Sequence, residues 1–268
     1  MGVTLDLRLI DHERLAVRGL QAVNDAIRHG DPEILRKYLT GLPVDVDSPI
    51  VDFHMERLSR LRDVEAPEII IRNEEQLLRL ANGEAYRPEE FQNSTLDELR
   101  QLLGTWCWVT HSYSLDKAWD ELHWFLEPMA GPDDSPLQPF LRLEVGDPSQ
   151  TVYGKALRGE VHYPKDDLGD PVIRTLGSHD PDCSGYNAPE TCMVILEALQ
   201  GVEPAAWEEH VPFRCELYRR ACAGLDNEEI AGLVEDELSL ARDVFDVLVA
   251  AYSKAVEKGY GVSCEYSL

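Results

Sequence analysis

The chain is poor in basic residues for its size. Its 268 residues include 25 lysines and arginines against 50 aspartates and glutamates, which gives a formal net charge of −25. A field of this sign repels nucleic-acid phosphates and anionic membranes and attracts cationic partners. We therefore expect no nucleic acid and no membrane among the partners, and a basic protein is the favoured partner. High solubility, or the acidity typical of a high-salt or high-G+C bacterial proteome, explains the same charge without any partner.

Long apolar runs are missing as well. No stretch approaches the roughly 18 residues that a membrane-spanning helix needs. The first residues set Asp6 and Arg8 among apolar ones, unlike the basic head and apolar core of a secretory signal. We expect a cytoplasmic protein. The cysteines stand singly, without a CxxC pair, at positions 107, 183, 192, 215, 222 and 264. Buried free thiols are then expected in place of a disulfide framework.

Motifs that carry known chemistry are also absent. The sequence contains no HExxH or HxxxH pair, no GxSxG elbow and no GxxxxGK[ST] phosphate loop, which removes the simplest signals for a zinc enzyme, a serine hydrolase and a nucleotide-binding protein. One mixed group of metal-ligand types occurs, at His179, Asp180, Asp182, Cys183 and Cys192. It could hold a metal, but ligands without a regular spacing are more typical of a polar loop. We predict no metal and no cofactor.

The remaining composition is that of a folded globular protein. Hydrophobic residues make up 44% and charged residues 28%, which is ordinary for a soluble domain. The length suits one large domain or two modest ones. We predict a single α+β domain over residues 1–268, with loop-rich insertions near 30–100 and 128–190.

The most sharply patterned stretch runs from Ser114 to Pro128, SLDKAWDELHWFLEP. It predicts a helix over 114–127, with Ser114 as the N-cap and Pro128 as the end. Apolar residues recur at spacings of three and four, at Leu115, Ala118, Trp119, Leu122, Phe125 and Leu126. This pattern indicates one wide face covered by other elements. His123 follows Trp119 by one turn, beside that face.

A second, longer helix is predicted over residues 227–258. Asp226 and Glu229 have the spacing of a capping box, and Gly259 is placed to end the helix. At 1.5 Å per residue it would be about 45 Å long. The stripe expected to be buried consists of Ile230, Val234, Leu238, Ala241, Phe245, Leu248, Tyr252 and Val256. Acidic residues gather in the first half of this helix, among them Glu235, Asp236 and Glu237.

The two chain ends predict strands. Apolar and polar residues alternate over Val3–Ile10 and again over 262–268, so we expect these segments to pair in a small mixed or antiparallel sheet. That sheet would pack against the two helices above. Between them, the β-branched run at 69–72 could be a short strand or the start of a helix, and its residue types favour the strand. Ser94 is the expected N-cap of a following helix. The tryptophans at 106 and 108 are expected in the core, and stacking on a ligand is the alternative.

Three separated segments carry a family resemblance. The runs KAWDELHWFL, GKALRGE and AYSKAVEKGYGVSCEY resemble the YfbM-like family of bacterial proteins of unknown function. The resemblance covers residues 105–268 and, less closely, 1–20. It implies a small α+β bacterial domain and brings no established activity. Extra sequence near 30–100 and 130–190 departs from the family pattern.

Two kinds of function follow from these observations. The first is a non-enzymatic binding protein, similar to an inhibitor or immunity protein, whose acidic surface binds a basic protein; its candidate residues are Trp119, His123, Glu235, Asp236 and Glu237. The alternative is an enzyme of unassigned class with His123 or His162 as acid–base group, in a pocket between the central helix and the inserted loops. Against it, a lone histidine beside an apolar face is more often a core residue. A purely structural or oligomer-forming domain is a third possibility.

Overall fold

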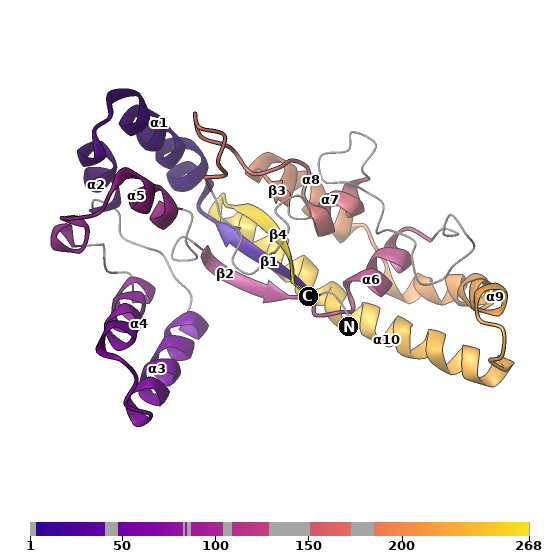
Figure 1. Ribbon diagram of the computed structural model, residues 1–268. Helices are drawn as coiled ribbons and strands as arrows, with labels where there is room; N and C mark the ends of the chain where they lie inside the picture. Colours follow the sequence, from indigo (N-terminus) through magenta and orange to yellow (C-terminus); the bar gives the residue numbers. More distant parts are fainter. Residues whose placement is uncertain are drawn as a thin grey trace. The chain divides into compact units, whose positions relative to one another are not determined.

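The structure is a computed structural model with an α+β fold (Figure 1). It describes residues 4–40, 48–82, 84, 87–103, 109–128, 151–172 and 185–267. The chain divides into two compact units. Unit 1 comprises Met1–Leu7, Tyr113–His162 and Gly177–Leu268, and unit 2 comprises Arg8–Ser112 and Tyr163–Leu176. Among the helices described, none is both long and apolar enough to span a membrane.

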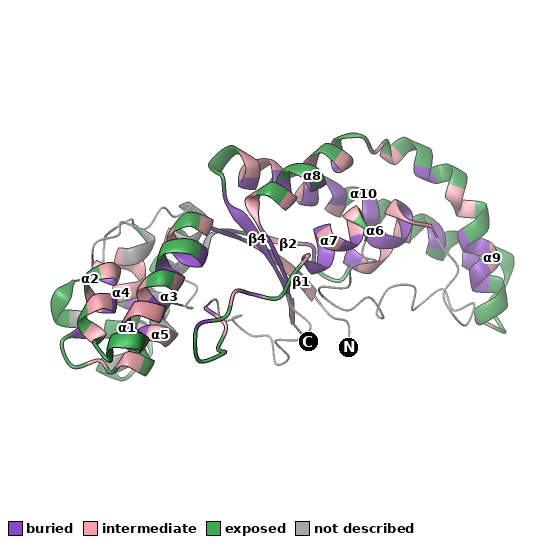
Figure 2. Ribbon diagram, turned by 90° about the horizontal axis from the view of Figure 1, so that it is seen from above, coloured by how far each residue is buried: buried purple, intermediate pink, exposed green. Residues whose placement is uncertain are grey.

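The predicted pairing of the two chain ends is confirmed. A four-stranded antiparallel sheet has the order β2 (Val109–Ser114), β1 (Thr4–Ile10), β4 (Gly261–Ser267) and β3 (Gly185–Asn187). Alternation in β1 buries every second side chain, and Leu5, Leu7 and Leu9 are fully buried. Strand β4 is almost wholly buried (Figure 2). The short β3 pairs with β4 in the register Gly185 to Cys264.

Helix α7 (Val152–Arg158) approaches the sheet closely through the glycine that ends it. Gly159 has φ +82°, and a Cβ added there would lie 2.3 Å from the carbonyl carbon of Gly185. Only glycine permits both this backbone conformation and this approach. The turn after α7 therefore rests directly on the backbone of β3.

The long helix α10 (Asn227–Lys258) is confirmed as predicted. The Asp226 side chain accepts hydrogen bonds from the N–H groups of Glu228 and Glu229, and the Glu229 carboxylate accepts one from the Asp226 N–H. At the other end, Gly259 ends the helix at φ +69°. Its buried stripe contains Ile230, Val234, Leu238, Ala241, Phe245, Leu248 and Tyr252. Val256, the last residue predicted for this stripe, is only half-buried, and its neighbour Ala255 is buried. The neighbouring elements of unit 1 are α6 (Trp119–Leu126), α8 (Pro189–Gln200), a 3₁₀ segment (Pro204–His210) and α9 (Val211–Ala221).

Helix α6 starts later than the sequence predicts, so the proposed N-cap at Ser114 is wrong. Ser114 is the last residue of β2. The Leu115 N–H donates to the Leu5 carbonyl at 2.8 Å, and the Asp116 carbonyl accepts from the Leu5 N–H at 3.1 Å. These bonds continue the pairing with β1, and Asp116 has φ +48°, which is outside the helical region. Ala118 is the N-cap, at φ −81° and ψ 1°, and the helix begins at Trp119.

The described part of unit 2 is mainly helical outside its share of the strands and the loop 163–172. A π-helical segment (Glu13–Gly19) leads into α1 (Leu20–His29), which ends at Gly30 with φ +61°. The later elements are α2 (Pro32–Thr40), α3 (Ser48–Asp63), α4 (Glu68–Ala81), a 3₁₀ turn (Pro88–Phe91) and α5 (Leu96–Leu103).

Two local predictions in unit 2 are wrong. The β-branched run at 69–72 lies in α4, where the Ile70 and Ile71 N–H groups donate to the Pro67 carbonyl. Packing of α4 against α3 outweighs the weak β preference of these residues. The N-cap of α5 is Thr95 and not Ser94: the Thr95 hydroxyl accepts from the Glu98 N–H at 3.3 Å, and Glu98 accepts from the Thr95 N–H at 2.7 Å.

The predicted insertions are only partly described. The one near 30–100 belongs to unit 2 and is mainly helical, whereas much of the one near 128–190 lies outside the described residues. The tryptophans at 106 and 108 also lie outside them. The single domain stays a prediction, because compactness alone does not show which parts fold independently.

Candidate functional site

Helix α6 carries two of the predicted binding residues into the core of unit 1. Trp119 is 3% exposed and meets Tyr266 edge to face, with the ring centroids 5.1 Å apart. His123 is fully buried, and its Nε2 lies 3.3 Å from the Glu127 carboxylate. Burial lowers the pKa of His123, although Glu127 acts in the opposite direction. A partner in solution would reach neither ring without a change in the structure.

His162, the other predicted acid–base group, is exposed in the segment after α7. It forms no ion pair or hydrogen bond with the part of the chain that the structure describes. The structure therefore shows no contact that would place His162 and His123 in one site. The pocket predicted beside the inserted loops involves residues outside the described ranges, and the enzyme alternative stays a prediction.

A group of polar side chains, of which the sequence singled out only Glu237, lies where α6, α9 and α10 meet. We call Asp120, Glu121 and Glu237 the carboxyl cluster. Arg214 of α9 binds Glu237 through Nε at 2.9 Å and Nη2 at 3.3 Å, and the Tyr218 hydroxyl donates to the same carboxylate. Arg214 is 4% exposed. Its guanidinium also lies over the ring of Trp124, 4.7 Å from the centroid.

The two carboxyl groups from α6 are less well satisfied. Asp120 Oδ1 and Glu121 Oε2 are buried and have no hydrogen-bond partner. Burial raises the pKa of Asp120, against the lowering effect of Arg214 and Arg158. It also raises the pKa of Glu121, and the charges of Asp120 and Glu237 act in the same direction. The cluster can therefore hold a proton, but Arg214 and Tyr218 are already committed to Glu237, and no reactive partner group accompanies it among the described residues.

No metal site is found in the part of the chain that the structure covers. No group of three or more histidine, cysteine or acidic side chains is placed to hold an ion there. Of the predicted group around His179, only Cys192 is described. It is a buried free thiol at the start of α8, and burial raises its pKa to about 12. The other three described cysteines are also free.

The exposed side of α10 is acidic. We call Glu228, Glu235, Asp236, Asp243 and Asp246 the acidic face. All five side chains are exposed, and their spacing places them opposite the buried stripe. Two of the three acids predicted from this helix, Glu235 and Asp236, lie on this face. The third, Glu237, turns away from it into the carboxyl cluster.

Most basic residues near the acidic face in the sequence pair with other acids. Residues 185–267 contain sixteen acidic and six basic residues. Five of the six basic ones form ion pairs with acids outside the acidic face: Arg214 with Glu237, Arg219 and Arg220 with Glu216, Arg242 with Glu208, and Lys254 with Glu257. No ion pair to the acidic face itself is found among the described residues. Its charge is left uncompensated.

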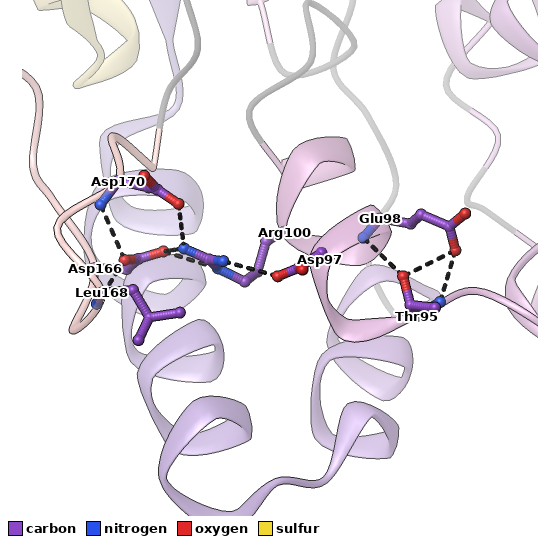
Figure 3. Close-up of polar contacts among 7 residues, drawn as sticks. All are labelled: Thr95, Asp97, Glu98, Arg100, Asp166, Leu168 and Asp170. Atoms are coloured by element: carbon purple, nitrogen blue, oxygen red, sulfur yellow. Dashed lines mark hydrogen bonds and ion pairs between the residues drawn. The ribbon is translucent and has the colours of Figure 1, made fainter.

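Unit 2 shows a different arrangement, in which one basic side chain pairs with three acids (Figure 3). Arg100 of α5 binds Asp166 at 2.6 Å, Asp170 at 2.7 Å and Asp97 at 3.0 Å. Asp166 is buried and also accepts from the Leu168 and Asp170 N–H groups. Arg100 thus holds the loop 163–172 against α5.

A cavity of about 230 Å³ adjoins this ion-pair group in unit 2. Its walls include Val23, Leu103 and Val172 together with the paired side chains. Each of the three carboxylates that line it pairs with Arg100, and Asp166 also accepts two backbone hydrogen bonds, so these side chains already serve to hold the loop in place. We therefore regard this cavity as a feature of the packing of unit 2 and not as a ligand site.

Unit 2 also contains a buried histidine and glutamate pair. His54 Nδ1 of α3 lies 2.5 Å from Glu74 Oε1 of α4, and both residues are 2% exposed. Arg57 Nε lies 3.3 Å from the other Glu74 oxygen. This pair joins the two helices of the hairpin. No sequence signal marks it, because 20 residues separate its members.

In comparisons with protein-family models, curated protein sequences and solved structures, nothing matches the chain. The resemblance to the YfbM-like family therefore stays a prediction.

Proposed function

We propose that the chain is a cytoplasmic, non-enzymatic binding protein that uses the acidic face of α10 to bind a basic protein. The observation that carries this proposal is the uncompensated charge of that face. Five exposed acids lie along one side of a helix with well-defined ends, and the basic residues nearby in the sequence pair with other acids.

The physical consequence is attraction that depends on salt. An exposed ion pair contributes only about 0.2–1 kcal/mol, so five such pairs give modest affinity and mainly speed the encounter with a cationic surface. Screening over about 8 Å at physiological ionic strength weakens each of them. We expect an association that is strongest at low salt and is lost as salt rises.

The test removes the charge of the acidic face without touching its shape. One variant carries Glu228→Gln, Glu235→Gln, Asp236→Asn, Asp243→Asn and Asp246→Asn. The matched control removes the same five charges from exposed, unpaired positions of unit 2, through Asp52→Asn, Asp63→Asn, Glu65→Gln, Glu68→Gln and Glu89→Gln. Each protein is used to capture partners from a lysate of the source cells at low and at physiological salt.

The expected result is one basic protein recovered in stoichiometric amount with the wild type and with the unit 2 control, lost with the α10 variant and lost as salt rises. Recovery of that protein at the same level with the α10 variant would show that the acidic face is not the binding surface. Recovery of no basic protein by the wild type at low salt would remove the proposal.

A further inference from the structure

Two exposed leucines lie beside the acidic face on α10. Leu233 is 42% exposed and Leu240 is 48% exposed. With Asp236 and Asp243 they form a row along the helix, Leu233, Asp236, Leu240 and Asp243, at spacings of three, four and three residues. We call this the leucine–aspartate row. Such spacings put all four side chains on one side of a helix and are those of the a and d positions of a coiled coil.

We propose that the element of the basic partner that binds α10 is an amphipathic helix, with apolar side chains opposite the two leucines and lysine or arginine opposite the two aspartates. This inference rests on the proposed function and specifies the shape of its partner. It follows from the chemistry of the row and from its repeat distance.

The chemistry of the row selects alternating side chains. Covering a leucine with an apolar side chain is favourable by about 25 cal/mol for each Å² removed from water. Covering Asp236 or Asp243 with an apolar side chain would desolvate a carboxylate without compensation, which costs several kcal/mol. A lysine or arginine opposite each aspartate avoids this cost. A uniformly apolar segment would match only the two leucines, and a uniformly basic segment would match only the two aspartates.

The repeat distance selects a helix. The two leucines are seven positions apart along the helix, which is about 10.5 Å along its axis. A partner helix repeats its a positions at the same distance. An extended segment repeats its side chains on one face about every 6.8 Å, so it cannot keep apolar and basic groups in step with the row.

A second copy of this chain is a poorer occupant. Two α10 helices packed through the row would bring their acidic faces together, and like charges at close range are unfavourable. The charge of the face therefore acts against self-association and in favour of a cationic helix.

The experiment uses the full chain and two synthetic peptides of about 21 residues, which is three heptads. The matched peptide has leucine at a and lysine at d. The second peptide has the same composition in a scrambled order, so its charge is equal and its register is lost. Binding is measured by fluorescence anisotropy at low and at physiological salt. The variants are Leu233→Ser with Leu240→Ser, and Asp236→Asn with Asp243→Asn. Circular dichroism verifies that each variant is folded.

We expect the matched peptide to bind at least about tenfold more tightly than the scrambled one, and either pair of substitutions to abolish most of this difference. Equal binding of the two peptides, unchanged by the leucine substitutions, would overturn the helical register but leave the charge-based proposal standing. If neither peptide binds at low salt, the proposed function fails as well. A wild-type dimer in sedimentation analysis that the leucine substitutions dissociate would assign the row to self-association and overturn the inference.

Discussion

At the scale of single residues, the most unusual feature is that the three acids of the carboxyl cluster differ in their hydrogen-bond partners. Glu237 accepts hydrogen bonds from Arg214 and Tyr218, whereas Asp120 and Glu121 each have one buried oxygen without a hydrogen-bond partner. A buried polar atom without a partner costs about 1–3 kcal/mol. Burial also raises the pKa of both carboxyl groups. Their ionisation therefore opposes folding.

This imbalance predicts a pH-dependent gain from neutral substitutions. A carboxyl group whose pKa is raised by folding binds its proton more tightly in the folded state, so its contribution to stability falls as the pH rises from the unfolded value, about 4, through the folded one. We expect Asp120→Asn with Glu121→Gln to be more stable than the wild type at pH 7.5, by roughly 1–2 kcal/mol. The gain should shrink toward pH 4, because the raised pKa of each group favours the protonated form as the pH falls.

Urea unfolding at the two pH values measures this effect. The control is Glu235→Gln with Asp236→Asn, an exposed pair of adjacent acids that removes the same charge without relieving any buried group. A double variant at Asp120 and Glu121 that is less stable than the wild type at pH 7.5 would mean that these carboxylates stabilise the fold.

At the scale of elements, tertiary contacts hold segments that have little structure of their own. The loop 163–172 is the clearest case. Arg100 reaches it from α5 with an 11% exposed side chain, and the Asp166 side chain it contacts is 4% exposed. Removing the cation would leave a buried carboxylate without its charge partner, which typically costs 3–5 kcal/mol.

We therefore expect Arg100→Met to release the loop and to destabilise unit 2 by roughly 3 kcal/mol. Lys165 is exposed within this loop, so limited digestion with trypsin reports its release as faster cleavage after Lys165. Arg62→Met is the control, because Arg62 pairs with Glu75 at an exposed position where such a pair contributes little. Equal cleavage rates in the Arg100 variant and the wild type would show that Arg100 does not hold the loop.

At the scale of the whole molecule, the dominant quantity is the net charge of −25. Charge of one sign at this level opposes the compact state through repulsion. Most of the ion pairs described are exposed, and each contributes little. The repulsion therefore outweighs the attraction over the molecule, and the same excess of acids gives α10 its uncompensated face.

This balance predicts that the protein becomes more stable as salt is added. We expect the thermal unfolding midpoint to rise by several degrees between about 0.02 M and 0.3 M sodium chloride, since the screening length falls well below the size of the molecule. The α10 variant with five neutralised acids should show a smaller rise. A midpoint that falls with salt would mean that intramolecular ion pairs outweigh the repulsion.

The parts of the protein whose signals are local can be predicted from the sequence. The capping box at Asp226, the stripe at spacings of three and four, and the glycine at 259 predict α10 from end to end, because a helix makes its backbone bonds within itself. Alternation over the first strand likewise predicts β1 and its buried face. Together with the same alternation over 262–268, these patterns predict the α+β class and the pairing of the chain ends.

Features that depend on contacts between residues distant in the sequence become visible only in the tertiary structure. Helix α6 begins at Trp119 because Leu115 and Asp116 hydrogen-bond to Leu5, more than 100 residues earlier. Helix spacing already turns Glu237 toward the buried stripe, three residues after Val234, but only α9 supplies its partners Arg214 and Tyr218. The cluster with Asp120 arises from tertiary packing in the same way. The two residues of such a contact lie far apart in the chain. The number of acidic residues can therefore be counted from the sequence, but which of them pair with a basic residue cannot.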